Sequence, residues 1–81
     1  MEILMDDRVD ELAQSIVEFW APRRNIAVTT MVSAIAFRIS ERAEAAGKLE
    51  AKLRDTYPEF LVSVRAGDAG QWKVQKMRKF K

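Results

Sequence analysis

Near the N-terminus, apolar side chains recur every three or four residues in a segment that is otherwise polar and acidic. This spacing puts them on one side of a helix, because an α-helix completes a turn in about 3.6 residues. The stripe consists of Met5, Val9, Leu12, Ile16 and Phe19. We predict a helix over residues 6–20. Asp6 or Asp7 can cap its first turn, and Pro22 ends it because the residue before a proline avoids helical backbone.

A second pattern with helical spacing predicts a helix over residues 30–55. Its apolar positions are Val28, Val32, Ile35, Ile39, Ala43 and Ala46. Residues 25–30 also contain strand-forming side chains, so a short strand there is the alternative. Pro58 follows the predicted helix and terminates it.

Gly47 leaves the continuity of this helix open. It could end the helix and begin a short third one, since glycine is common at helix C-termini. Against that, Glu44–Lys48 and Glu50–Arg54 are acid-before-base pairs four residues apart, which stabilise a helix. The first pair spans the glycine and favours one continuous helix.

The C-terminal third alternates between apolar and polar residues, which is typical of strands. We predict an antiparallel hairpin of residues 60–66 and 71–77, joined by a turn that contains Gly67 and Gly70. A lone hairpin is barely stable in water, so the helices should cover its Trp72/Val74 face. The predicted fold is a single α+β domain over residues 1–81, with two main helices packed on this hairpin and a basic tail at 76–81.

Charge is distributed unevenly along the chain. Residues 1–22 hold six acidic side chains against one basic, whereas residues 59–81 hold six basic against two acidic. The longest uncharged stretch, Asn25–Phe37, has thirteen residues. A membrane-spanning helix needs about 20, so we expect no association with a membrane. The absence of cysteine suits a reducing compartment, and we expect a cytoplasmic protein.

The residue types needed for most catalysis are missing. The chain has no histidine and no cysteine, which removes imidazole and thiol chemistry and the usual zinc ligands. The acidic cluster at Asp6, Asp7, Asp10 and Glu11 could gather a hard cation, but negative charge at a helix N-terminus explains it equally. We therefore expect no enzymatic activity, no cofactor and no metal.

Basic residues near the C-terminus are candidates for contact with nucleic acid or with an acidic partner. Neutralising phosphates with such side chains releases counterions and so adds affinity. The candidates are Arg65, Lys73, Lys76, Arg78, Lys79 and Lys81. The alternative is that these lysines only protect a solvated edge strand from aggregation. Trp72 could stack on a base, but the strand pattern predicts that it packs in the core.

A helix-turn-helix arrangement is a further possibility. Ala43, Gly47 and Leu53 have the spacing of that motif, and the hairpin would then form a wing. Arg42 and Lys48, however, occupy positions where the motif prefers apolar side chains. The alternative function is a DNA- or RNA-binding protein that uses the basic C-terminal hairpin and tail and that could be winged-helix-like.

The function we predict is a small, non-enzymatic binding module, such as a subunit, adaptor or inhibitor, that acts through protein–protein contact. Trp20, Arg23 and Arg24 form an aromatic–basic corner of the kind found at interface hot spots. The alternative for Trp20 is that it closes one end of the core. The stripe Met5, Val9, Leu12, Ile16 and Phe19 could also pack on its own copy to form a homodimer.

Overall fold

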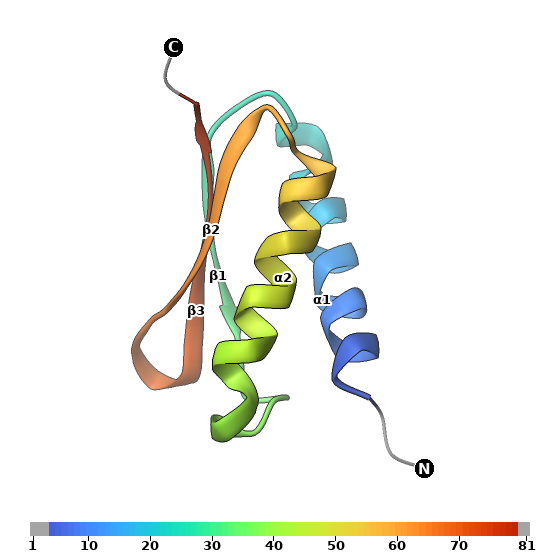
Figure 1. Cartoon of the computed structure of the whole chain (residues 1–81). Helices are drawn as coiled ribbons and strands as arrows, with labels where there is room; N and C mark the ends of the chain where they lie inside the picture. The colour runs from blue at the N-terminus through green and yellow to red at the C-terminus, as the bar shows by residue number, and fades with distance from the viewer. Residues whose placement is uncertain (1–3, 80–81) are drawn as a thin grey trace.

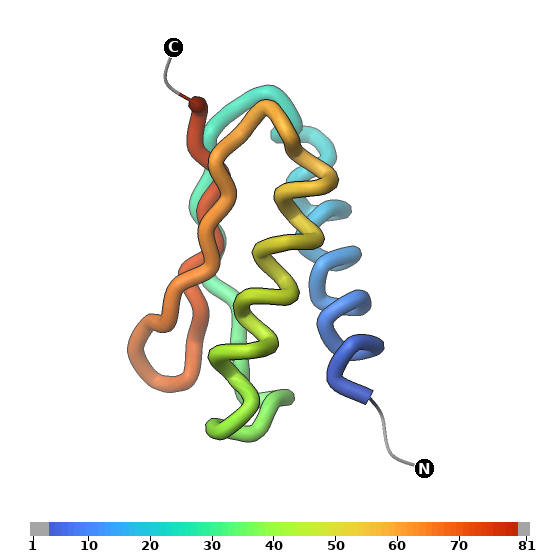
Figure 2. The backbone as a smooth tube through the Cα atoms, viewed as in Figure 1, coloured from blue at the N-terminus to red at the C-terminus, as the bar shows by residue number. Residues whose placement is uncertain are grey.

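The computed structural model describes residues 4–79, in which two α-helices lie side by side on one face of a three-stranded antiparallel sheet (Figure 1). The elements are α1 (Met5–Trp20), β1 (Val28–Ser33), α2 (Arg42–Thr56), β2 (Phe60–Ala66) and β3 (Gln71–Arg78), with 3-10 turns at Ala21–Arg23, Ile39–Glu41 and Asp68–Gly70. The tube in Figure 2 shows the chain reversing direction from each of these elements to the next. The α+β class is confirmed.

The last strand of the chain is the central strand of the sheet. The order is β1-β3-β2, so β3 pairs with both neighbours. Val74 lies between Thr30 of β1 and Val64 of β2 in the two registers. Side chains at even positions of β3 face the helices, and those at odd positions face away from them. The predicted hairpin is therefore present, but the sheet contains a third strand.

That third strand corrects the predicted second helix, which begins at Arg42 rather than near Thr30. Val28, Thr29, Thr30 and Val32 are β-branched, and such side chains favour a pleated strand over a helix. The short strand named as the alternative is the one that forms, and it extends to Ser33. Its residues alternate between half-buried and exposed, which the periodicity of a helix cannot produce.

The segment between β1 and α2 shows why the helical pattern was misleading there. Ile35 and Ile39 were counted as apolar helix positions, yet they are 73% and 81% exposed. Ala34 and Phe37 are instead the buried residues of this segment. Arg42 holds the segment in place, because its Nε donates to the backbone oxygens of Ala34 and Phe37.

α2 runs without interruption through Gly47 and ends at Thr56, next to the predicted stop at Pro58. Both predicted charge pairs form, with 3.6 Å between Lys48 Nζ and Glu44 Oε2 and 3.4 Å between Arg54 Nη2 and Glu50 Oε2. The prediction of a continuous helix is confirmed. The helix-turn-helix hypothesis is wrong, because it requires a turn at Gly47.

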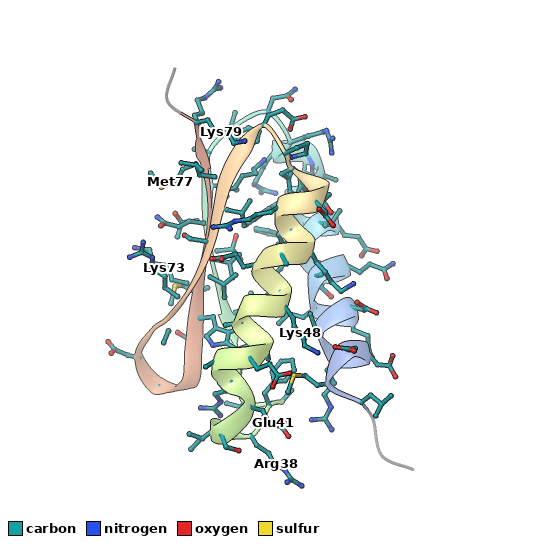
Figure 3. The ribbon with its side chains drawn as sticks, in the orientation of Figure 1. Arg38, Glu41, Lys48, Lys73, Met77 and Lys79 are labelled. Atoms are coloured by element: carbon teal, nitrogen blue, oxygen red, sulfur yellow. The ribbon has the colours of Figure 1, made fainter. Side chains whose placement is uncertain are left out.

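The first helix begins without the predicted side-chain cap. Leu4 is the capping residue of α1 and makes no side-chain hydrogen bond there. Asp6 instead pairs with Lys48, and Asp10 pairs with Lys52, so acidic residues of α1 face lysines of α2 (Figure 3 labels Lys48). The Lys48 ammonium holds the pKa of Asp6 below its usual value. These acids join the two helices at the surface.

Both helices and the sheet contribute to one core. Two of its large members are Trp72 of β3 and Phe37 of the segment between β1 and α2, whose rings stack with 5.4 Å between centroids. The other buried apolar residues are Val9, Ala13, Ile16, Trp20, Ala34, Ala45, Leu49, Leu53, Tyr57, Phe60, Val62 and Val74. The predicted burial of Trp72 and Val74 under the helices is confirmed.

Replacing Gly47 with alanine should stabilise the protein. A Cβ at Gly47 meets nothing within 4 Å, and alanine costs about 0.5–1 kcal/mol less than glycine inside a helix. We expect the free energy of unfolding in urea titrations to rise by about that amount. Gly70→Ala is the control and should destabilise, because Gly70 has φ +71°. A Gly47→Ala protein no more stable than the parent would contradict a continuous helix.

Candidate functional site

Lys76 is the one fully buried charged residue among those the structure describes, with a relative exposure of 0%. It points from the central strand toward the turn after α1. Its ammonium donates to the backbone oxygens of Arg23 at 2.8 Å and Arg24 at 2.7 Å. Three aromatic rings surround the nitrogen, with centroids at 4.4 Å for Phe60, 4.6 Å for Tyr57 and 5.7 Å for Trp20. Cation–π attraction and the two carbonyls replace the water that the charge has lost.

Burial shifts the pKa of both titratable groups in this cluster. It lowers the pKa of Lys76 below its usual 10.5, Arg24 lowers that pKa further, and Glu59 opposes the shift. Burial also raises the pKa of the Tyr57 phenol above 10.0, while Arg24 opposes that change. The structure thus corrects the expectation that Lys76 contacts a phosphate or an acidic partner, because its ammonium is inaccessible.

The prediction that Trp20 contacts a partner is also corrected. Its ring is completely buried, and its indole N–H donates to the Thr30 hydroxyl at 2.8 Å. The alternative, that Trp20 closes one end of the core, describes its position. Arg23 lies with its guanidinium 4.4 Å from the centroid of the Phe19 ring and donates to the Phe19 backbone oxygen. Arg24 is exposed and stays a candidate for contact with a partner.

Most of the predicted dimerisation stripe packs inside the protein. Val9 and Ile16 are buried, and Met5 and Leu12 are partly buried against the same core. Phe19 alone among the five is exposed, at 51%. The stripe therefore covers the sheet of its own chain, which leaves only one large side chain of the five for contact with a copy.

The face of the sheet opposite the helices is open to solvent, and we call it the open face. In Figure 3, Lys73 and Met77 project from it, away from α1 and α2. It consists of Thr29, Met31 and Ser33 of β1, Leu61, Ser63 and Arg65 of β2, and Gln71, Lys73, Gln75 and Met77 of β3. Met31, Leu61 and Met77 are 50%, 55% and 51% exposed. No member of the open face is acidic.

The predicted basic residues separate into two places. Arg65 and Lys73 are direct partners in the β2–β3 register, so both cations lie side by side on the open face. Arg78 and Lys79 lie at the far end of β3, where they line a groove with Arg24 and Glu59. Arg78 donates there to the Asn25 backbone oxygen at 3.0 Å. Lys81 lies outside the described residues.

Neither a metal centre nor a membrane span stands out in the described part of the chain. Within residues 4–79, no three acidic side chains come close enough together to hold a metal ion. Neither helix over this range has the length and apolar character needed to cross a membrane.

Sequence reasoning did not identify the open face because it favoured a helix over the alternative strand at β1. The signal was present in the alternation of Val28, Thr30 and Val32 with Thr29, Met31 and Ser33. Val28 and Val32 are also one helical turn apart, so the same residues fitted both periods.

Comparison with family models, with curated proteins and with solved structures finds no match for this chain.

Replacing Lys76 with methionine should destabilise the protein. Methionine keeps the length of the side chain against the three rings, but the carbonyls of Arg23 and Arg24 lose their donor. We expect a loss of about 1–3 kcal/mol in urea titrations. Lys73→Met is the matched control, because Lys73 is exposed on the other face of the same strand, and it should change stability by less than about 0.5 kcal/mol. Equal stability of the two variants would contradict the structural role of Lys76.

The stability difference between the parent protein and Lys76→Met should grow at alkaline pH. Because the folded-state pKa of Lys76 is lowered, the unfolded chain binds the proton more tightly between that pKa and about 10.5. The part of the Lys76 contribution that this pKa shift controls is therefore present above the unfolded-state pKa and is lost as pH falls through the folded-state pKa. The hydrogen bonds to Arg23 and Arg24 still stabilise the protein below that pKa. Urea titrations of both proteins between neutral and alkaline pH measure the difference. A gap that narrows as pH rises would contradict the shift.

Proposed function

We propose that this chain is a non-enzymatic binding module that contacts a protein partner through its open face. The observation that carries the proposal is the composition of that face. Three large, half-exposed apolar side chains, Met31, Leu61 and Met77, lie among hydroxyl and amide groups, with Arg65 and Lys73 adjacent and no acid present. Leu61 and Met77 pair across β2 and β3, and Met31 lies beside Lys73 further along the same face. A face that combines methionine, arginine and polar groups suits a protein interface, where methionine and arginine are enriched.

The charges of the open face define the kind of partner. Arg65 and Lys73 would meet carboxylates, which increases the rate of association and disfavours basic partners. The module would then act as a subunit, an adaptor or an inhibitor by occupying part of its partner's surface. A chain without cysteine suits the cytoplasm as the place where it acts.

Two features support a role other than catalysis. Histidine and cysteine are absent from the whole sequence. Lys76 is held by backbone carbonyls and aromatic rings inside the core, where a substrate cannot reach it. Its shifted pKa therefore has a structural cause and does not mark an active site.

Nucleic-acid binding is the second candidate, and the adjacency of Arg65 and Lys73 on an acid-free face favours it. Both cations could contact a phosphate backbone together with Lys79 at the end of β3. The open face, however, carries no aromatic side chain on which a base could stack. For this reason we favour a protein partner.

Photo-cross-linking in the source cell distinguishes these candidates. A photoreactive amino acid at Leu61 or at Met77 should form an adduct with one protein of defined mass. The same group at Ala51, which is exposed on α2, is the control and should not form that adduct. Lys73→Glu should reduce the yield, and Arg38→Glu, which reverses a charge in the loop before α2, should not (Figure 3). An adduct digested by nuclease would establish the second candidate, and identical adducts at Ala51 would contradict the proposal.

A further inference from the structure

The two edges of the sheet differ in how their backbone groups are satisfied. Along an edge strand, alternate residues direct their N–H and C=O groups toward the neighbouring strand and toward the free side. The Ala34 N–H donates to the Gly70 oxygen at 2.7 Å, one step beyond the Ser33–Gln71 pair. Even-numbered residues of β1 therefore direct their backbone N–H and C=O groups toward β3. Thr29, Met31 and Ser33 direct their backbone groups to the free edge.

α2 closes the opposite edge. On β2, the even-numbered residues direct their backbone groups away from β3, and side chains of α2 bind two of these groups. Arg54 Nε donates to the Val62 oxygen at 3.1 Å, and the Val64 N–H donates to Glu50 Oε1 at 3.0 Å. No comparable bond reaches the outward groups of Thr29, Met31 or Ser33 from any residue between 4 and 79. One edge of the sheet is thus closed and the other is open.

β1 also lacks the features by which natural edge strands avoid pairing. Those features are charged side chains, proline and bulges. β1 lies within the uncharged stretch Asn25–Phe37, and the stretch contains no proline. The strand itself therefore opposes pairing with neither a charged side chain nor a proline.

The core is incomplete beside the same edge. The side chains of β1 that face the helices, Val28, Thr30 and Val32, are only half-buried. Their counterparts on the central strand, Trp72 and Val74, are fully buried. Another strand beside β1 would cover these valines as well as pair the free backbone groups.

We propose that β1 pairs antiparallel with β1 of a second copy, around a twofold axis at Met31. In this register Met31 faces the copy's Met31, and Thr29 faces the copy's Ser33, so all three outward-facing residues find partners. Registers shifted by one residue about the axis leave some of them unpaired. The segment is therefore complementary to itself, as a twofold interface requires. Because β1 is uncharged, it does not favour an acidic or a basic partner, and a second copy of β1 suits it equally well.

Pairing of the two copies would produce one sheet in the order β2-β3-β1-β1-β3-β2. Beyond the strand, the exposed Ile35 of one copy would approach Ala27 and Ile26 of the other. The two open faces would become one continuous surface, so the dimer would present the proposed binding surface twice. The dimer depends on the β1 edge and does not require that the proposed function be correct.

The oligomeric state in solution tests this inference. Light scattering coupled to gel filtration, at about 10–500 µM to include weak dimers, should give twice the chain mass of 9.3 kDa. Met31→Lys places like charges at the axis, and Met31→Pro removes an outward N–H that no β3 group accepts. Both should yield the monomer mass with the circular dichroism of the parent. Leu61→Lys, an equivalent change on the closed edge, should remain dimeric. A parent that is monomeric throughout, or a dimer that survives both Met31 variants, would overturn the proposal.

Single cysteines test the register, because the chain has none of its own. Hydrogen-bonded residues in an antiparallel pair lie about 5.5 Å apart at Cα, within the range of about 4.4–6.8 Å for disulfides. Met31→Cys should form a disulfide-linked dimer under mild oxidation. Thr29→Cys alone should not, whereas Thr29→Cys combined with Ser33→Cys should. Efficient linkage through Thr29→Cys alone would place the axis elsewhere and overturn the register.

Discussion

The buried ammonium of Lys76 holds the two ends of this fold together. It lies on the central strand, near the end of the chain, and its two acceptors belong to the turn that follows the first helix. An ammonium without water needs its acceptors and its surrounding groups in place, because desolvation costs several kcal/mol when they are absent. Trp20, Tyr57 and Phe60, from three different segments, supply that environment. Lys76 thereby links the C-terminal part of β3 to the turn after α1.

The position of β3 determines which surfaces remain for other molecules. Because β3 is central, its even-numbered side chains enter the core and its odd-numbered ones form the middle of the open face. Placing β1 and β2 at the edges then gives each a free side. Glu50 and Arg54 close one of these, and the uncharged β1 remains on the other. The exposed face and the open edge of the sheet therefore follow from strand order as much as from composition.

Elements with a single possible period were predictable from sequence. The α1 stripe repeats every three or four residues and fits no strand, and Phe60, Val62 and Val64 alternate as no helix does. Residues 28–39 were different, because their apolar positions satisfied both periods. Strand-forming propensity and pairing with β3 decided between them. For the same reason only part of the open face was predictable. Lys73 and Arg65 were candidates from the sequence, but the predicted helix included their apolar neighbour Met31.

The sequence by itself determined the α+β class, the first helix, the C-terminal part of the second helix and the hairpin, since local periodicity and prolines after helices act over a few neighbouring positions. It also determined the absence of imidazole and thiol chemistry. Only the tertiary structure decided that Lys76 is buried while Lys73 is exposed, although both are lysines three residues apart in one basic segment. The alternation of the predicted strand already puts Lys76 on the same face as Trp72 and Val74. The burial of Lys76 depends on Trp20 and Tyr57, which come from distant segments that local periodicity cannot bring together.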